Sequence, residues 1–303
     1  HRSARIVLAH RLWQKGLIHS EMDLIAQALF VVSKVIETAP SDTVYQLRAQ
    51  LNLSMHRFEQ ARLDLLRVSK PSNQTQALLR QTALLAGNAV LAGDTKKQVQ
   101  YPSTIALAAT QASVHISNKN LKQAAALLAQ AVDAIADTNP IPMVALHLIG
   151  AQLADAQGDK ALATAHINRA VKRLPNHIGA LEAKAALQQN AGQFKQAIAC
   201  LSLAKTHSSD PHLTGLLASV YALNGNEVMA KRLDSQAIAQ FRQALRKYPR
   251  AYAGEAAYYF AHLGYNHNRL LEAQKWAKFD VNNRPLHQQR LLLADIRQQL
   301  EQQ

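Results

Sequence analysis

Residues 144–177 read VALHLIGAQLADAQGDKALATAHINRAVKRLPNH, and the organisation of this stretch predicts the fold. Its first half, VALHLIGAQLADAQ, carries apolar residues at the spacing of one face of a helix. Gly158-Asp159 then interrupts the helix, and KALATAHINRAVKRL repeats the apolar spacing before Pro175. The block therefore predicts a helix, a short turn, a second helix and a stop.

Prolines mark the ends of such blocks along the whole chain. They stand at positions 40, 71, 102, 140, 142, 175, 211, 249 and 285, so that successive stops lie 31 to 38 residues apart. Because proline cannot continue a helix, it commonly follows a helix end. A period in this range is typical of arrays of stacked structural repeats.

Small residues recur at fixed offsets within the blocks. One set and its counterpart a block later are Ala151, Gly158, Ala163 and Ala170, then Ala185, Gly192, Ala197 and Ala204. Two antiparallel helices need small side chains where their axes come closest. A single helix pair cannot bury its apolar face alone, so the pairs are expected to stack.

This pattern of small residues, turn glycine and terminal proline resembles the tetratricopeptide repeat (TPR). Blocks 144–177 and 178–211 match it best, and blocks 42–75, 105–142, 211–249 and 250–285 match with insertions or substitutions. The resemblance implies an all-α fold, a right-handed α-solenoid of about seven helix-turn-helix units with a C-terminal capping helix.

The departures from the pattern predict the organisation of the array. We expect an N-terminal array over residues 1–102, a C-terminal array over 103–285 and a capping helix over 286–303. The three form one continuous solenoid with a seam near Pro102, because Tyr101-Pro102-Ser103 stands where a second helix should end. The stretch 227–247 has no internal breaker, which predicts one helix about two turns longer than usual.

Catalytic and cofactor-binding motifs are missing from the sequence. It contains no phosphate-binding glycine loop, no nucleophile elbow and no pair of histidines one helical turn apart, so we expect no enzyme activity, no cofactor and no metal site. The single cysteine, Cys200, lies on an apolar helical segment and is expected to be a packing residue. No apolar run reaches the ~18 residues of a transmembrane helix.

The resemblance also implies where a partner binds. In TPR proteins the first helix of each unit lines a concave groove, which suits a peptide or a helix of a protein partner. Carried onto this chain, the groove positions are polar residues: Gln46, Gln50, Ser113, Gln152, Asp155, Glu182, Gln189, Asn190, His212, Ser219, Tyr258 and His262.

The positive net charge suggests a second kind of partner. The formal net charge is +14, and the densest basic cluster is Arg242, Arg246, Lys247 and Arg250. This cluster suits an anionic partner such as nucleic acid, although few aromatic residues are available to stack on bases.

The sequence therefore favours a non-enzymatic scaffold that binds protein or peptide in a multiprotein assembly. The alternatives are a regulatory or RNA-binding solenoid, or the repeat region of a larger protein whose N-terminal part is missing. The Gln- and Ala-rich, Lys-poor composition favours a bacterial periplasmic or envelope-associated protein over a cytoplasmic one. The partner's identity and the oligomeric state do not follow from the sequence.

Overall fold

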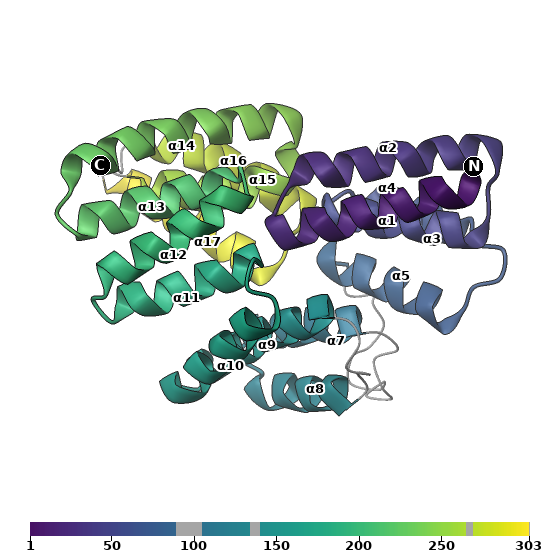
Figure 1. Cartoon of the computed structure of the whole chain (residues 1–303), viewed down its shortest axis with the longest axis horizontal. Helices are drawn as coiled ribbons and strands as arrows, with labels where there is room; N and C mark the ends of the chain where they lie inside the picture. The colour runs from purple at the N-terminus through teal and green to yellow at the C-terminus, as the bar shows by residue number, and fades with distance from the viewer. Residues whose placement is uncertain (89–104, 134–139, 265–268, 303) are drawn as a thin grey trace. The chain divides into compact units, whose positions relative to one another are not determined.

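The computed structural model describes residues 1–88, 105–133, 140–264 and 269–302. Within these ranges the chain forms 16 α-helices, one π-helical segment and no strand, so the prediction of an all-α fold is confirmed (Figure 1). The chain divides into two compact units, His1–Pro175 and Asn176–Gln303, here called unit 1 and unit 2.

Unit 1 is built from helices that pack as neighbours in chain order. They are α1 (Arg2–His19), α2 (Met22–Thr38), α3 (Asp42–Ser54), α4 (Phe58–Leu66), α5 (Asn73–Leu85), α7 (Ile105–Ser117), α8 (Leu121–Asp133), α9 (Pro140–Ala156) and α10 (Lys160–Arg173). The predicted seam at Pro102 lies outside the described residues, so the domain boundaries stay a prediction. The division of the chain into two compact units falls between Pro175 and Asn176.

Unit 2 continues the same succession of helix pairs. Its elements are α11 (Ile178–Asn190), α12 (Phe194–His207), α13 (Pro211–Leu223), α14 (Glu227–Lys247), α15 (Pro249–Tyr258), the π-helical η1 (Tyr259–Leu263), α16 (Leu270–Asn283) and α17 (His287–Glu301). The long helix predicted for residues 227–247 is confirmed as α14. Helix α17 follows the last pair and falls within the predicted capping segment.

In several helix pairs a single glycine forms the turn between the two helices, as the sequence of block 144–177 predicted. Helix α9 ends at Ala156 and α10 begins at Lys160, with Gly158 at φ +82° between them. Gly192 and Gly225 adopt φ values of +72° and +78° in the corresponding turns of unit 2. Glycine suits these positions because a side chain disfavours positive φ.

The prolines have a role that the sequence alone did not assign. Pro211 and Pro249 lie in the first turns of α13 and α15, and Pro140 begins α9. A proline suits a first helical turn because its missing N–H would have no intrahelical acceptor there, and its φ already fits a helix. Each of these prolines therefore opens the next helix.

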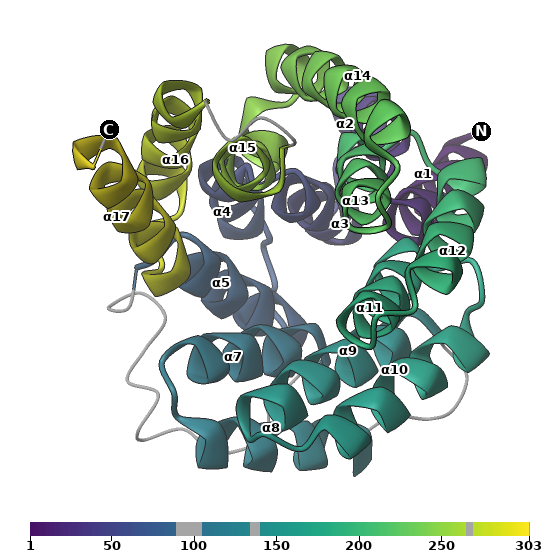
Figure 2. The same cartoon turned by 90° about the vertical axis from the view of Figure 1, so that its left-hand side faces the viewer.

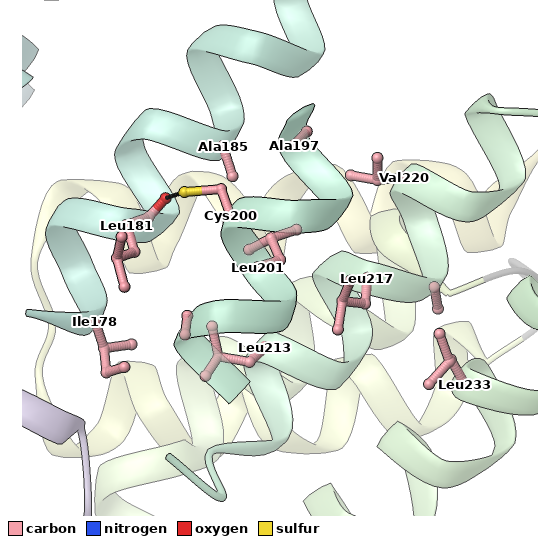
Figure 3. Close-up of a cluster of buried hydrophobic side chains, with 12 residues drawn as sticks. Ile178, Leu181, Ala185, Ala197, Cys200, Leu201, Leu213, Leu217, Val220 and Leu233 are labelled. Carbon is pink, nitrogen blue, oxygen red and sulfur yellow. Dashed lines mark hydrogen bonds between the residues drawn. The ribbon is translucent and has the colours of Figure 1, made fainter. Parts of the chain in front are cut away.

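The core of unit 2 joins the small residues to larger apolar ones (Figure 3). Ala185, Ala197 and Ala204 are fully buried between helices, and Leu201 and Leu213 fill the spaces beside them. Cys200 belongs to this cluster, and its Sγ lies 3.4 Å from the carbonyl oxygen of Leu181. Burial raises the pKa of this thiol, and the prediction of a packing cysteine is confirmed.

A buried polar contact anchors the last helix pair of unit 2. The Tyr259 hydroxyl donates to Oδ1 of the buried Asp234 on α14, and the Tyr259 ring stacks on Phe241 with ring centroids 5.2 Å apart. Gly215 of α13 faces this ring so closely that a Cβ at that position would collide with it. The π-helical segment therefore places Tyr259 and Phe260 in the core of unit 2.

Candidate partner-binding face

The predicted groove residues of unit 1 lie on its first helices, and one of them links two helix pairs. Nε2 of Gln46 on α3 donates to Oγ1 of Thr75 on α5 over 2.6 Å. Gln81 of α5 makes the same type of bond to Thr110 of α7 over 3.1 Å. Part of this polar face therefore stabilises the packing of successive pairs.

The other predicted residues of unit 1 differ in exposure. Gln50 and Ser113 are half-buried, whereas Gln152 and Asp155 on α9 are exposed. No hydrogen bond or charge contact of the described residues joins these four to one another. In unit 1 the predicted set therefore forms no common cluster.

Unit 2 brings several polar residues of its first helices into one electrostatic environment. Desolvation raises the pKa of Glu182 on α11 well above its ordinary value, and the carboxylates of Asp210 and Glu255 raise it further. Asp210 precedes α13 and Glu255 lies on α15, so the three acidic groups come from successive helix pairs. We call Glu182, Asp210 and Glu255 the acidic face.

Glu255 is the member of the acidic face that lies on the exposed side of α15. Although solvent reaches the side chain, desolvation by the surrounding protein raises its pKa to about 7. Arg284 opposes this shift, but its guanidinium already binds both oxygens of Asp280, at 2.8 and 2.9 Å. Asp280 itself adds to the upward shift.

His212 lies beside the acidic face at the start of α13. Its backbone N–H donates to Oδ1 of Asp210 over 2.9 Å, which caps the helix. Burial lowers the pKa of the His212 imidazole despite the neighbouring carboxylate of Asp210. The buried Nδ1 of this ring has no hydrogen-bond partner among the described residues.

Tyr258 and His262 extend the first-helix face towards the C-terminus. Tyr258 is exposed, and its ring centroid lies 5.0 Å from that of His262. Nε2 of His262 lies 3.1 Å from Oδ2 of Asp295 on α17, which ties the π-helical segment to the last helix. The remaining predicted residues, Gln189, Asn190 and Ser219, are half-buried or exposed on α11 and α13.

Sequence reasoning found Glu182 but missed Asp210 and Glu255. Glu255 precedes Tyr258 by three residues and His262 by seven, so all three share one helix face. That spacing was the available signal for Glu255. Asp210 had no such signal, because its position before Pro211 is equally typical of a helix cap.

The predicted basic cluster is partly neutralised within the chain. Arg242 of α14 binds both oxygens of Glu272 on α16, at 3.1 and 2.8 Å, which lowers the pKa of Glu272. Lys247 lies 5.3 Å from the ring centroid of Tyr248, and Arg246 is exposed. The proposal that Arg242, Arg246, Lys247 and Arg250 bind an anionic partner stays a prediction.

The described part of the chain lacks both a cluster of metal ligands and a membrane-spanning helix. It contains no group of three His, Cys, Asp or Glu side chains placed to hold a metal. The nearest approach is a histidine pair, His147 and His166, with 3.3 Å between their Nδ1 atoms. None of the described helices combines the length and apolar character of a membrane span.

The helix pairs, their glycine turns and the small residues at the pair contacts define a TPR-like fold. No family model and no curated protein matches the sequence. The fold assignment is supported by one solved structure with a TM-score above 0.5, and the exact number of repeats stays a prediction.

Three solved structures illustrate the likeness. The APC/C heterotetramer Cut9–Hcn1 is 13% identical, with a TM-score of 0.56 over 90% of this chain and 52% of that chain. The type IV pilus biogenesis factor PilW is 15% identical, with a TM-score of 0.40 over 80% of this chain and 94% of that chain. The P58(IPK) TPR domain is 13% identical, with a TM-score of 0.28 over 97% and 77%. This chain spans about half of the Cut9–Hcn1 chain, and these identities describe the fold alone.

Proposed function

We propose that this chain is a non-enzymatic scaffold that binds a partner protein, and that the acidic face of unit 2 holds a basic segment of that partner. Lysine or arginine side chains of the segment pair with Glu182 and Glu255. The proposal rests on one observation: the half-buried Glu182 and the exposed Glu255 both have raised pKa values, and neither has a hydrogen bond or ion pair from the described residues.

A cationic partner group relieves the cost of this arrangement. A desolvated carboxylate without a counter-ion is unfavourable, and an opposite charge nearby favours its ionised form. The Arg284 guanidinium does not serve this purpose, because it is engaged by Asp280. A lysine or arginine of the partner therefore gains an ion pair and displaces protons from the acidic face.

The neighbouring side chains suit an extended peptide. Tyr258 offers an exposed aromatic face for a cationic side chain, and Asn190 offers an exposed amide for the peptide backbone. This arrangement makes the bound segment specific for charge at one or two positions, while the rest of the segment is held through its main chain.

A peptide-display selection tests the proposal. The intact chain is compared with the double variant Glu182→Gln/Glu255→Gln and with a control, Glu227→Gln/Glu301→Gln, that changes the net charge equally at exposed positions. We expect wild type and control to enrich peptides with lysine or arginine, and the double variant to lose that enrichment at least tenfold. Equal enrichment by all three proteins contradicts the proposal.

The envelope location and the bacterial source favoured by composition stay predictions. The peptide selection does not depend on either of them.

A further inference from the structure

A hollow of about 510 Å³ lies between α16 and α17, the last two helices of unit 2. The two helices lie side by side in both views of the chain (Figure 2). The hollow is lined by Lys278, Val281, Asn282, Arg290, Leu293, Ala294 and Arg297. None of these residues belongs to the acidic face.

The lining residues form one stripe on each helix. On α16 they are residues 278, 281 and 282, and on α17 they are residues 290, 293, 294 and 297. These spacings place each set on a single helix face over one to two turns. The hollow is therefore an elongated groove between two helices, the shape that accommodates a third helix. We call it the α16–α17 groove.

The groove combines an apolar floor with cationic walls. Leu293 is buried and Val281 is half-buried, whereas Lys278, Arg290 and Arg297 are exposed. No carboxylate lines the groove. Within the described part of the chain, Arg290 and Arg297 have no ion-pair partner, and Lys278 donates only to Gln274, over 3.0 Å.

In the preceding helix pair, the basic residue equivalent to Lys278 forms an ion pair. Arg242 lies seven residues before Pro249, and Lys278 lies seven residues before Pro285, so they occupy equivalent places on α14 and α16. Arg242 binds Glu272 of α16, the second helix of the next pair. Lys278 holds the same position with no carboxylate to receive it.

Helix α17 carries arginines where the preceding repeat carries small residues. Arg290 and Arg297 stand 36 residues after Gly254 of α15 and Ala261 of η1. Gly254 allows close packing of α16, since a Cβ there would come within 2.8 Å of Nη2 of Arg284. With arginines at these places, the face of α17 suits a wider, charged contact with carboxylates that reach outward.

We propose that the α16–α17 groove binds an acidic amphipathic helix of a partner protein. Its apolar stripe lies on Val281 and Leu293, and its glutamates or aspartates pair with Lys278, Arg290 and Arg297. Because Arg290 and Arg297 are about 10 Å apart along α17, the matching acidic residues lie two turns apart on the partner helix. This surface acts independently of the acidic face.

Fluorescence anisotropy with a designed helix tests this inference on the intact chain. The probe is a labelled, end-capped peptide of about 18 residues with leucines and glutamates on one face. We expect binding that weakens as salt is added, because the contact is electrostatic. Arg290→Glu/Arg297→Glu reduces the affinity at least tenfold, and Arg290→Gln/Arg297→Gln reduces it less.

A charge-swapped pair makes the test specific. A peptide with lysines in place of the glutamates is expected to bind Arg290→Glu/Arg297→Glu and not the wild type. The control Lys195→Glu/Arg232→Glu changes net charge equally at exposed positions of α12 and α14 and keeps wild-type affinity for the acidic peptide. Thermal melts establish that all variants fold.

Several results overturn the inference. They are absence of binding to wild type, equal binding by the groove variants, or failure of the swapped peptide to rescue. Tighter binding of single-stranded RNA, or of vesicles containing phosphatidylglycerol, through the same two arginines shows a polyanion site and rejects the helix. A dimer that forms without peptide and is lost in the groove variants identifies a second copy of the chain as the occupant.

Discussion

Carboxylates of unit 1 and unit 2 differ in whether a side chain of the same unit donates hydrogen bonds to them. In unit 1, the buried Asp64 of α4 accepts hydrogen bonds from Arg48 and Asn52 of α3, the Arg48 Nε bond being 2.9 Å long. In unit 2, Glu182 and Glu255 share the acidic face with no such donor among the described residues. The first carboxylate is neutralised within its own helix pair, whereas the second set has no such donor among the described residues, which is why we propose that a partner supplies one.

Unit 2 also contains a carboxylate that is neutralised by an arginine of its own. Asp280 and Arg284 of α16 form a bidentate pair with the same function as Asp64 and Arg48. Asp64 and Asp280 each receive a guanidinium from the same helix or its neighbour, and the buried Asp234 receives the Tyr259 hydroxyl instead. The carboxylates without such a donor are the best candidates for intermolecular contact.

The largest expected effect comes from breaking the neutralised pair of unit 1. Asp64→Ala removes the partner of Arg48, whose side chain is only 19% exposed, and we expect the free energy of unfolding to fall by about 3 kcal/mol. Urea denaturation in a Trp276→Phe background measures this, because Trp13 then reports unit 1 alone. The control Glu59→Ala breaks an exposed pair with Arg62 and should change little.

A smaller loss of stability is expected when Asp234, a buried carboxylate of unit 2, loses its hydrogen-bond donor. Tyr259→Phe deletes the hydroxyl that donates to Asp234, so we expect a loss of about 1–2 kcal/mol. The same denaturation in a Trp13→Phe background follows unit 2 through Trp276. Tyr258→Phe alters an exposed neighbour and is the matched control. A loss no larger than that of the control rejects a structural role for this bond.

Replacing Glu255 should raise the free energy of unfolding at high pH, whereas the two substitutions above lower it. Its pKa of about 7 in the folded chain lies above the ordinary value of 4.5, so the folded state binds more protons than the unfolded state between these values. Stability contributed by the protonated group is therefore present below pH 4.5 and is lost as pH rises towards 7. Glu255→Gln should stabilise unit 2 at pH 8, by no more than about 1 kcal/mol because solvent screens the carboxyl.

The expected stabilisation is tested by measuring how the difference in stability between Glu255→Gln and the wild type depends on pH. At pH 5 the variant and the wild type should unfold at similar urea concentrations, since Glu255 is protonated in both the folded state and part of the unfolded population. The groups acting on Glu255 in the folded state are Arg284, Asp280 and Glu182. Destabilisation of the variant at pH 8 would mean that the ionised carboxylate supports the fold.

Most of the fold was predictable because local signals repeat along the chain. The proline stops, Gly158 and the small residues of block 144–177 each act within one helix pair, so the sequence carries them directly. The long helix α14 was predictable from the absence of a breaker. The π-helical turn at Tyr259 was not, because it depends on a contact with Asp234 of another helix.

The acidic face could be predicted only in part. The resemblance to the TPR pattern implied that Glu182 lies on the face of the first helices, together with the neighbouring Tyr258 and His262. The coupling of Glu182 to Glu255 depends on how α11 and α15 approach each other in unit 2, which no local pattern reports. The α16–α17 groove was missed for another reason: its lining comes from two helices, and the hollow between them depends on how these helices pack.

A carboxyl NMR titration tests the central claim most directly. The intact chain, with ¹³C at the glutamate side-chain carboxyls, is titrated with and without a basic peptide from the selection, and Glu255 is assigned with Glu255→Gln. We predict a midpoint of about 7 for Glu255 in the free chain, and a shift to lower pH when the peptide binds. A midpoint near the ordinary value of 4.5, unchanged by peptide, would contradict the account.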